Sequence, residues 1–81
     1  MFSKELFAER LLALRKEAGE TQEDIAGLLD VKRTQVSEME RARKTTTVEK
    51  LSILCDHFNV TADYLLGLSD ERRPLKEQNP S

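Results

Sequence analysis

The side chains best suited to binding chemistry are concentrated in one short segment, residues 32–44. This segment holds five basic residues and two acidic ones, whereas the whole chain of 81 residues carries a net charge of −2. At about 100° per residue, one side of a helix here would be polar. That side would carry Thr34, Ser37, Glu38 and Arg41. Such a face can hydrogen-bond the edges of nucleic acid bases, and a basic patch on an acidic body favours one orientation on a polyanion.

The other reactive side chains do not form a catalytic or metal-binding set. His57 is the only histidine and Cys55 the only cysteine, so the sequence offers neither a metal cluster nor a paired nucleophile and base. No glycine-rich phosphate loop is present. We therefore expect no enzyme activity, no metal, no cofactor and no small-molecule ligand.

Length and hydropathy further limit the classes of protein to which the chain can belong. A chain of 81 residues allows one domain with one modest core. No apolar run approaches the roughly 18 residues of a membrane span, and residues 1–5 lack the layout of a signal peptide. A single cysteine cannot form an internal disulfide, which fits a reducing compartment. We expect a cytoplasmic, nucleoid-associated protein that does not bind membranes.

Apolar spacing and capping residues predict an all-α fold with five helices. They are expected at about residues 4–17, 22–30, from just after 32 to about 42, 48–58 and 62–66. Thr21, Thr47 and Thr61 are the expected N-caps of three of them. We place the domain at residues 1–68 and a polar, flexible tail at residues 69–81, which contain both prolines and one apolar residue.

The fourth predicted helix has an apolar stripe that is expected to face the core. Its members are Val48, Leu51, Leu54, Cys55 and Phe58. A thiol on such a stripe behaves as a small apolar side chain, so Cys55 is expected to be a buried core residue.

The second and third predicted helices form a helix-turn-helix from about Thr21 to Ala42. Only the turn Asp30-Val31-Lys32 separates them. Two short helices joined by so tight a turn pack steeply only if the crossing residue is small, and Ala26 supplies that residue. Val36 and Met39 supply the apolar contacts that hold the third helix, which leaves its outer face polar.

Several pieces of this sequence, in order and spacing, resemble the phage repressor and Cro (XRE) family of helix-turn-helix regulators. They are Thr21-Gln22-Glu23-Asp24-Ile25-Ala26, residues 31–40 and Tyr64-Leu65-Leu66-Gly67. The resemblance covers roughly Leu6 to Leu68. It implies a five-helix lambda-repressor-like domain in a sequence-specific DNA-binding transcriptional regulator, expected to be a repressor, whose third helix reads operator DNA in the major groove.

The resemblance also assigns DNA contacts residue by residue. Gln22 matches a position that hydrogen-bonds a phosphate at the start of the second helix. Arg33 is the strongest candidate base reader, because a guanidinium can grip guanine O6 and N7 together. Thr34 can touch a base or a thymine methyl, and Glu38 can accept from cytosine N4. The full set, which ends with two loop residues expected to contact phosphates, is Gln22, Lys32, Arg33, Thr34, Ser37, Glu38, Arg41, Arg43 and Lys44.

Arg15 and Glu40 match a family pair that forms a salt bridge between the first and third helices and fixes the angle of the third.

Three residues depart from the family pattern. Asp30 and Ala42 stand where glycine is common, and the second of these changes is expected to lengthen the third helix or alter the loop. Glu20 stands where an apolar residue is usual.

The family further implies a homodimer on an inverted repeat of double-stranded DNA, with half-sites roughly 34 Å apart. The exposed parts of the fourth and fifth helices and the tail are the expected dimer surface. The alternative is a protein-interaction module or antirepressor on the same fold that does not bind DNA. The acidic balance of the chain motivates this alternative, and salt separates the two, because DNA binding weakens steeply as salt rises.

Overall fold

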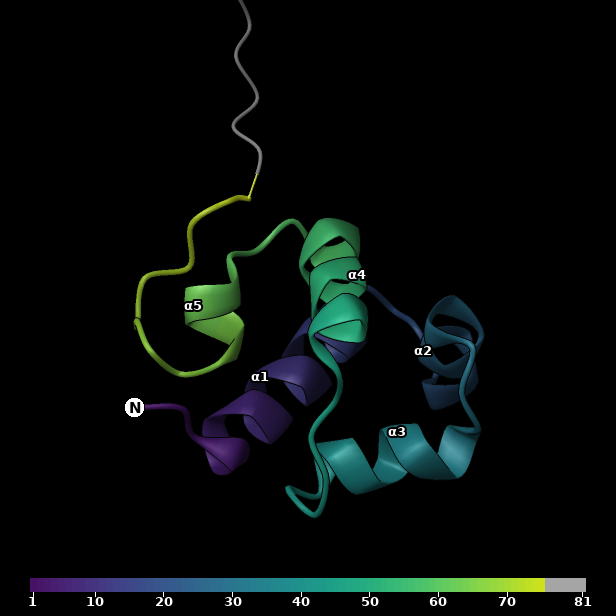
Figure 1. Cartoon of the computed structure of the whole chain (residues 1–81). Coiled ribbons are helices and arrows are strands. Elements are labelled where there is room, and N and C mark those ends of the chain that lie inside the picture. Colours follow the sequence, from purple (N-terminus) through teal and green to yellow (C-terminus); the bar gives the residue numbers. More distant parts are fainter. Residues whose placement is uncertain (76–81) are drawn as a thin grey trace, which may run out of the picture.

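The structure, a computed structural model, describes residues 1–75 of the 81-residue chain. Within them it contains five α-helices and no strand, so the predicted all-α class is confirmed (Figure 1). The helices are α1 (Lys4–Glu17), α2 (Gln22–Leu29), α3 (Arg33–Glu40), α4 (Val48–Phe58) and α5 (Ala62–Leu65). None of these helices is long and apolar enough to cross a membrane.

Short polar side chains cap the N-termini of α1, α2, α4 and α5. Ser3 Oγ accepts an N–H of the first turn of α1 at 3.1 Å. At the start of α2 the Asp24 N–H donates to Thr21 Oγ1 at 3.1 Å, and the Thr21 N–H donates to Asp24 Oδ2 at 2.8 Å. This reciprocal capping box satisfies two backbone donors that the helix itself leaves unpaired. Thr47 and Thr61 cap α4 and α5, so the three predicted threonine caps are confirmed.

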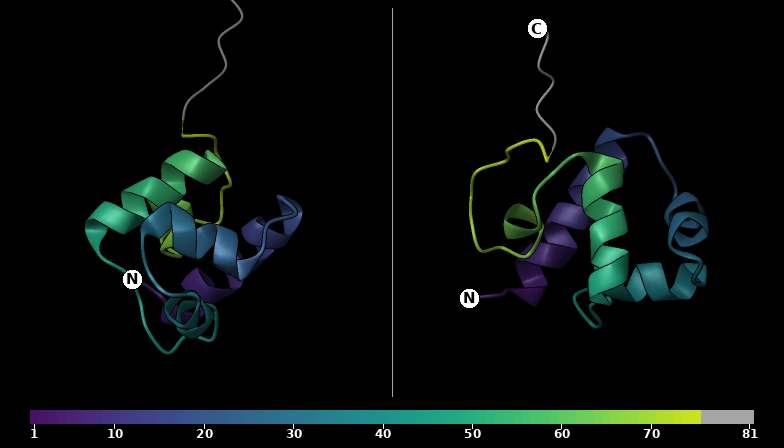
Figure 2. Two further views of the ribbon diagram at one scale, coloured as in Figure 1. Left: turned by 90° about the vertical axis from the view of Figure 1, so that its right-hand side faces the viewer. Right: turned by 45° about the horizontal axis from the view of Figure 1, so that its top comes forward.

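One core joins all five helices. α1 packs against α3 and α5, α4 packs against α2 and α5, and α2 packs against α3. Figures 1 and 2 show α2 and α3 on one side of the molecule and α5 on the other. The buried core consists of Phe7, Leu11, Leu14, Ile25, Ala26, Leu29, Val36, Met39, Leu54, Cys55, Val60 and Leu65. Because Val36 and Met39 belong to it, the packing that holds the domain also holds α3.

The inner face of α4 differs from the prediction at its first residue. Val48 is 81% exposed, so its assignment to the core stripe was wrong. Helical side chains point toward the N-terminus, and the first residue of α4 therefore points past the end of the core. Cys55 is buried as predicted, and burial raises the pKa of its thiol.

The segment after α5 runs back along the domain. Arg10 of α1 donates to the carbonyls of Tyr64 and Ser69 and pairs with Asp70 at 2.9 Å. Arg72 forms two hydrogen bonds of 2.7 Å with the carboxylate of Glu17. The predicted tail begins at Ser69, and its residues 76–81 lie outside the described part, so the boundary at residue 68 stays a prediction.

Candidate nucleic-acid interface

The turn between α2 and α3 has the tight geometry of a helix-turn-helix. α2 ends at Leu29, and Asp30 adopts a left-handed conformation with φ of +56°. The Val31 N–H then donates to the Ala26 carbonyl at 3.0 Å. The alanine is 6% exposed and lets the helices approach closely. The aspartate preserves the turn because it tolerates the left-handed region better than most residues.

α3 has one buried side and one open side. Val36 is fully buried and Met39 is 3% exposed, so both predicted inner contacts are present. Arg33, Thr34 and Arg41 are exposed, and no other helix covers this side of α3 (Figures 1 and 2). The side chains of the open face therefore remain available to a ligand.

An ion pair between α1 and α3 fixes the angle of α3. Arg15 Nε donates to Glu40 Oε2 at 2.6 Å, and Arg15 Nη2 donates to Glu40 Oε1 at 3.0 Å. The two side chains are only 12% and 4% exposed. The hydrogen bond to Glu40 raises the pKa of the Arg15 guanidinium. The structure thus brings together the two residues that the resemblance paired.

Gln22 extends this pair to the exposed end of α3. Its Nε2 donates to Glu40 Oε1 at 2.9 Å, and its Oε1 accepts from Arg33 Nη1 at 3.1 Å. One amide therefore connects the buried carboxylate to the leading candidate base reader. Sequence reasoning missed this network, because it depends on how α2 crosses α3 and no local pattern reports that angle.

The loop after α3 is organised by the backbone of Glu38. Its carbonyl accepts from the N–H groups of Arg43 at 2.9 Å and Lys44 at 3.4 Å. Its carboxylate lies 3.6 Å from Lys44 Nζ. Ala42 adopts a left-handed φ of +59°, and α3 ends at Glu40, so the alanine does not lengthen the helix. A β-carbon in that region is strained by about 1 kcal/mol or more.

Glu20, which departs from the family pattern, has a partner that the sequence did not reveal. His57 Nε2 lies 2.9 Å from both carboxylate oxygens of Glu20, and the Glu20 carbonyl accepts from Arg15 Nη1 at 2.8 Å. The residue therefore joins the α1–α2 connection to α4 by a polar contact. The contact gives His57 a structural role at this connection.

The predicted contact residues form one continuous region along α3 and its two ends. Lys32 precedes α3, and its N–H donates to Gln35 Oε1 at 3.0 Å. Ser37 and Glu38 are half-buried at the edge of the open face. The exposed members are Lys32, Arg33, Thr34, Arg41, Arg43 and Lys44. Among residues 1–75, no group of three or more His, Cys, Asp or Glu side chains is placed to hold a metal ion.

Comparison with known proteins places this geometry in a family. A model of the helix-turn-helix family matches residues 11–65. The HTH-type transcriptional regulator YobD of Bacillus subtilis is 32% identical over 73 residues, which are 90% of this chain and 65% of that protein. The HTH-type transcriptional regulator PrpR of Mycobacterium tuberculosis is 34% identical over 71 residues, which are 88% of this chain and 15% of that protein. The chain thus spans less than two thirds of either relative.

A solved structure agrees with these sequence matches. A transcriptional regulator from Listeria innocua superposes with a TM-score of 0.75 at 35% identity, covering 80% of this chain and 61% of that one. The two relatives that match this chain in sequence are named transcriptional regulators, which are not a class of enzyme. The predicted resemblance is confirmed: the chain belongs to the helix-turn-helix family of DNA-binding transcriptional regulators, of the phage repressor and Cro (XRE) type.

Proposed function

We propose that this chain binds operator DNA with α3 in the major groove and represses transcription, in the cytoplasm and on the nucleoid. One observation carries the proposal: α3 has an exposed polar face, while its opposite side is fixed by buried Val36 and Met39 and by the Glu40 ion pair. A reader of base edges must be held at a defined angle, because hydrogen bonds to bases tolerate little misplacement.

The side chains divide into readers and anchors. Arg33 reads guanine through O6 and N7, with Thr34 beside it, and Ser37 and Glu38 contact bases at the edge of the same face. Gln22, at the N-terminus of α2, contacts a phosphate. Anchoring by charge falls to the basic residues at the two ends of α3, which are Lys32, Arg41, Arg43 and Lys44.

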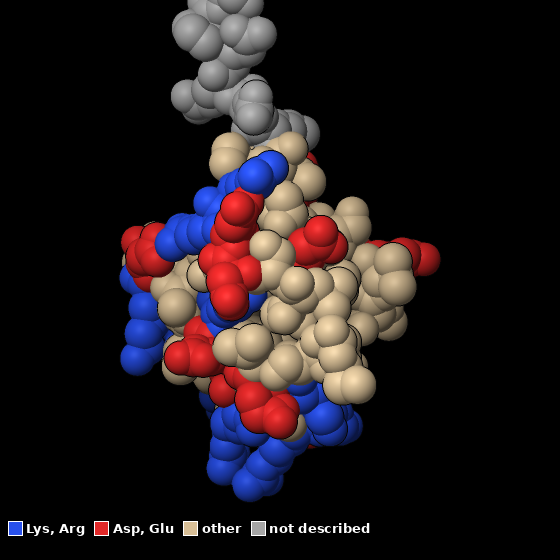
Figure 3. Space-filling view, turned by 90° about the vertical axis from the view of Figure 1, so that its left-hand side faces the viewer, with Lys and Arg blue, Asp and Glu red and all other residues tan. Residues whose placement is uncertain are grey.

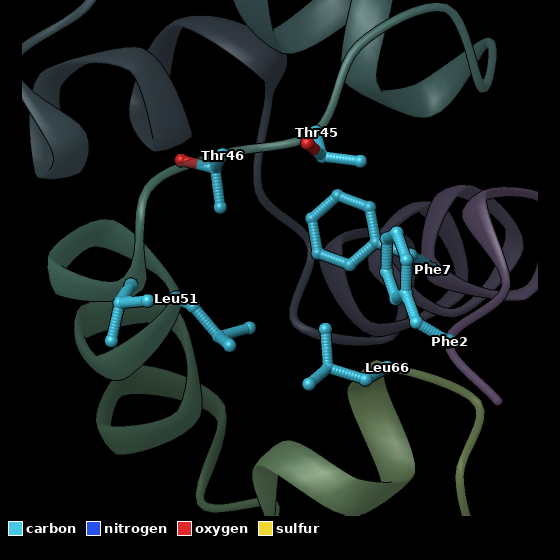
Figure 4. A pocket seen from close by; sticks show the side chains of 7 residues that line it. Phe2, Phe7, Thr45, Thr46, Leu51 and Leu66 are labelled. Carbon is cyan, nitrogen blue, oxygen red and sulfur yellow. The ribbon is translucent and has the colours of Figure 1, made fainter.

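The proposed homodimer places two such helices on an inverted repeat, with half-sites roughly 34 Å apart. Support comes from exposed apolar side chains that do not belong to α3: Val48, Ile53 and Leu68 are 81%, 39% and 50% exposed. A hollow of about 230 Å³ adjoins Val48 (Figure 4). Its walls are formed by Phe2, Phe7, Thr45, Thr46, Val48, Leu51 and Leu66. Apolar surface of this kind is typical of a contact with another protein chain, here a second copy.

Salt titration of DNA binding tests the proposal. A labelled duplex of about 21 base pairs covers two helical turns. In a plot of the logarithm of the binding constant against the logarithm of salt, the four anchoring cations of each protomer should contribute a slope of about −3 to −4, to which any further phosphate contact adds. No binding at low salt would favour the interaction module on the same fold instead.

The oligomeric state is tested in the same preparation. Sedimentation should give a dimer, and a footprint at saturation should cover two half-sites. A monomer that protects one half-site at saturating concentration would contradict the dimer and leave DNA binding in place.

A further inference from the structure

We infer that Lys4 forms, with Arg43 and Lys44, a second contact surface for the DNA backbone, beyond the residues that the family resemblance assigns. This inference rests on the proposed DNA binding. The three cations, here called the flank patch, come from segments far apart in the sequence. They line one shallow hollow on the surface together with Phe2 and Thr45. None of the five lining residues is acidic, so the hollow can accept an anion.

The flank patch keeps its positive charge available. Lys4 and Arg43 are exposed, and neither forms an ion pair with any other residue from 1 to 75. Lys44 lies 3.6 Å from Glu38, but its own side chain is 64% exposed. Figure 3 shows Lys and Arg side chains gathered at the lower end of the molecule, the end at which α3 and its following loop lie in Figure 1. On a chain of net charge −2, this cluster of positive charge is suited to phosphates.

The backbone under Lys4 is fixed from both sides. The Ser3 N–H donates to the Leu66 carbonyl at 3.1 Å, and Ser3 Oγ caps α1. Phe2 lies against the core residue Phe7, with ring centroids 6.5 Å apart (Figure 4). The other half of the patch is held by the Glu38 carbonyl in the loop after α3. Cations on rigid supports lose less freedom on binding a phosphate than cations on mobile arms.

Lys4 has no evident role in folding. It is the first residue of α1, where the partial positive charge of the helix N-terminus disfavours a cation. It adds to the same positive field that attracts a phosphate. Because the flank patch adjoins the C-terminal end of α3, the DNA contact it makes is to the backbone beside the groove that α3 reads. Such a contact is independent of base sequence.

The test uses the full chain and two duplexes of about 21 base pairs, each titrated across a salt series: one of mixed sequence, and one that carries a site selected by the wild type from a random library. Lys4→Ala should make the salt slope less negative by about one and weaken binding roughly fivefold to tenfold at 0.1 M salt. The loss should be the same on the selected duplex and on the mixed-sequence duplex. Lys4→Arg should retain wild-type binding. The thermal midpoint of Lys4→Ala should equal or slightly exceed that of the wild type.

Lys16→Ala is the matched control. It removes the same charge from the same helix, about 18 Å along the axis from Lys4, which exceeds the screening length of about 10 Å at 0.1 M salt. Its binding should match the wild type. Equal losses in both variants would reduce the effect to net charge and overturn the inference.

Three other outcomes also overturn it, and each has a different meaning. An unchanged Lys4→Ala, with intact wild-type binding, would remove Lys4 from the interface and leave the proposed function standing. A loss confined to the selected duplex would make Lys4 a base reader. Absence of wild-type binding to any duplex would contradict the proposed function itself, and the flank patch would then need an acidic protein as its partner.

Discussion

The Glu40 carboxylate of α3 accepts hydrogen bonds from the Arg15 guanidinium of α1 through both of its oxygens, at 2.6 and 3.0 Å. Oε1 also accepts from Gln22, so a single carboxylate joins three helices of the domain. With 4% of its side chain exposed, this carboxylate depends on its partners for compensation of its charge. The orientation of α3 therefore depends on one buried polar group as well as on apolar packing.

Replacing Glu40 by alanine should be strongly destabilising. The substitution leaves the Arg15 charge nearly buried without its partner, at an expected loss of about 3 kcal/mol in the free energy of unfolding. For a domain of this size the thermal midpoint should fall on the order of 15 °C. Arg15→Ala should behave similarly, while Glu49→Ala, on an exposed site of α4, should change little. If the thermal unfolding curves of Glu40→Ala and Arg15→Ala coincide with that of the wild type, the claim that this ion pair holds α3 in place is contradicted.

Two glycine substitutions should shift stability in opposite directions. Gly27 is exposed within α2, and an added Cβ would meet no atom within 4 Å. Gly27→Ala should therefore stabilise the domain by about 0.5–1 kcal/mol through helix propensity. Gly67 has φ of +77°, and an added Cβ would lie 3.0 Å from Leu6 Cβ, so Gly67→Ala should destabilise it. Urea unfolding of both variants checks the pair, and the same sign of change in both would contradict the backbone assignment.

The capping box of α2 should make the free energy of unfolding depend on pH in the acidic range. Hydrogen bonds from the Thr21 backbone and side chain lower the pKa of Asp24 below its ordinary value of about 3.9. A carboxylate whose pKa is lower in the folded state contributes stability that is present above the unfolded pKa and lost as pH falls through the folded one. Asp24→Asn should lose stability at pH 7 and approach the wild type in acid. A difference in stability between Asp24→Asn and the wild type that stays constant with pH would contradict this role of the capping box.

The pKa of Glu17 should show whether the segment after α5 lies against α1. The two hydrogen bonds from Arg72 lower the pKa of the Glu17 carboxyl in the folded protein. An NMR titration should therefore place that pKa below the ordinary range of glutamate, and Arg72→Ala should return it. Arg73→Ala is the control, because Arg73 pairs with Glu71 and not with α1. An ordinary Glu17 titration in the wild type would indicate that residues 69–75 do not rest on α1.

Local features of this fold could be predicted from the sequence, and long-range polar contacts could not. The threonine caps follow from side chains within three residues of the backbone groups they satisfy, and the tight turn at Asp30 follows from the helical spacing of apolar residues on either side of it. The Gln22 bridge requires the angle between α2 and α3. The Arg10 contacts with the segment after α5 join residues that no periodic pattern relates. Val48 was misplaced because helical periodicity gives the direction of a side chain and not where the core ends.

The central claim is that α3 reads base sequence, and selection from a random duplex library tests it most directly. The wild type, Arg33→Ala/Thr34→Ala and Lys16→Ala should be selected side by side at one salt concentration. The account predicts that the wild type and Lys16→Ala enrich the same short, roughly palindromic site, and that the double variant loses it while still folding. Failure of the wild type to enrich any sequence at low salt, or enrichment of an unchanged site by the double variant, would contradict it.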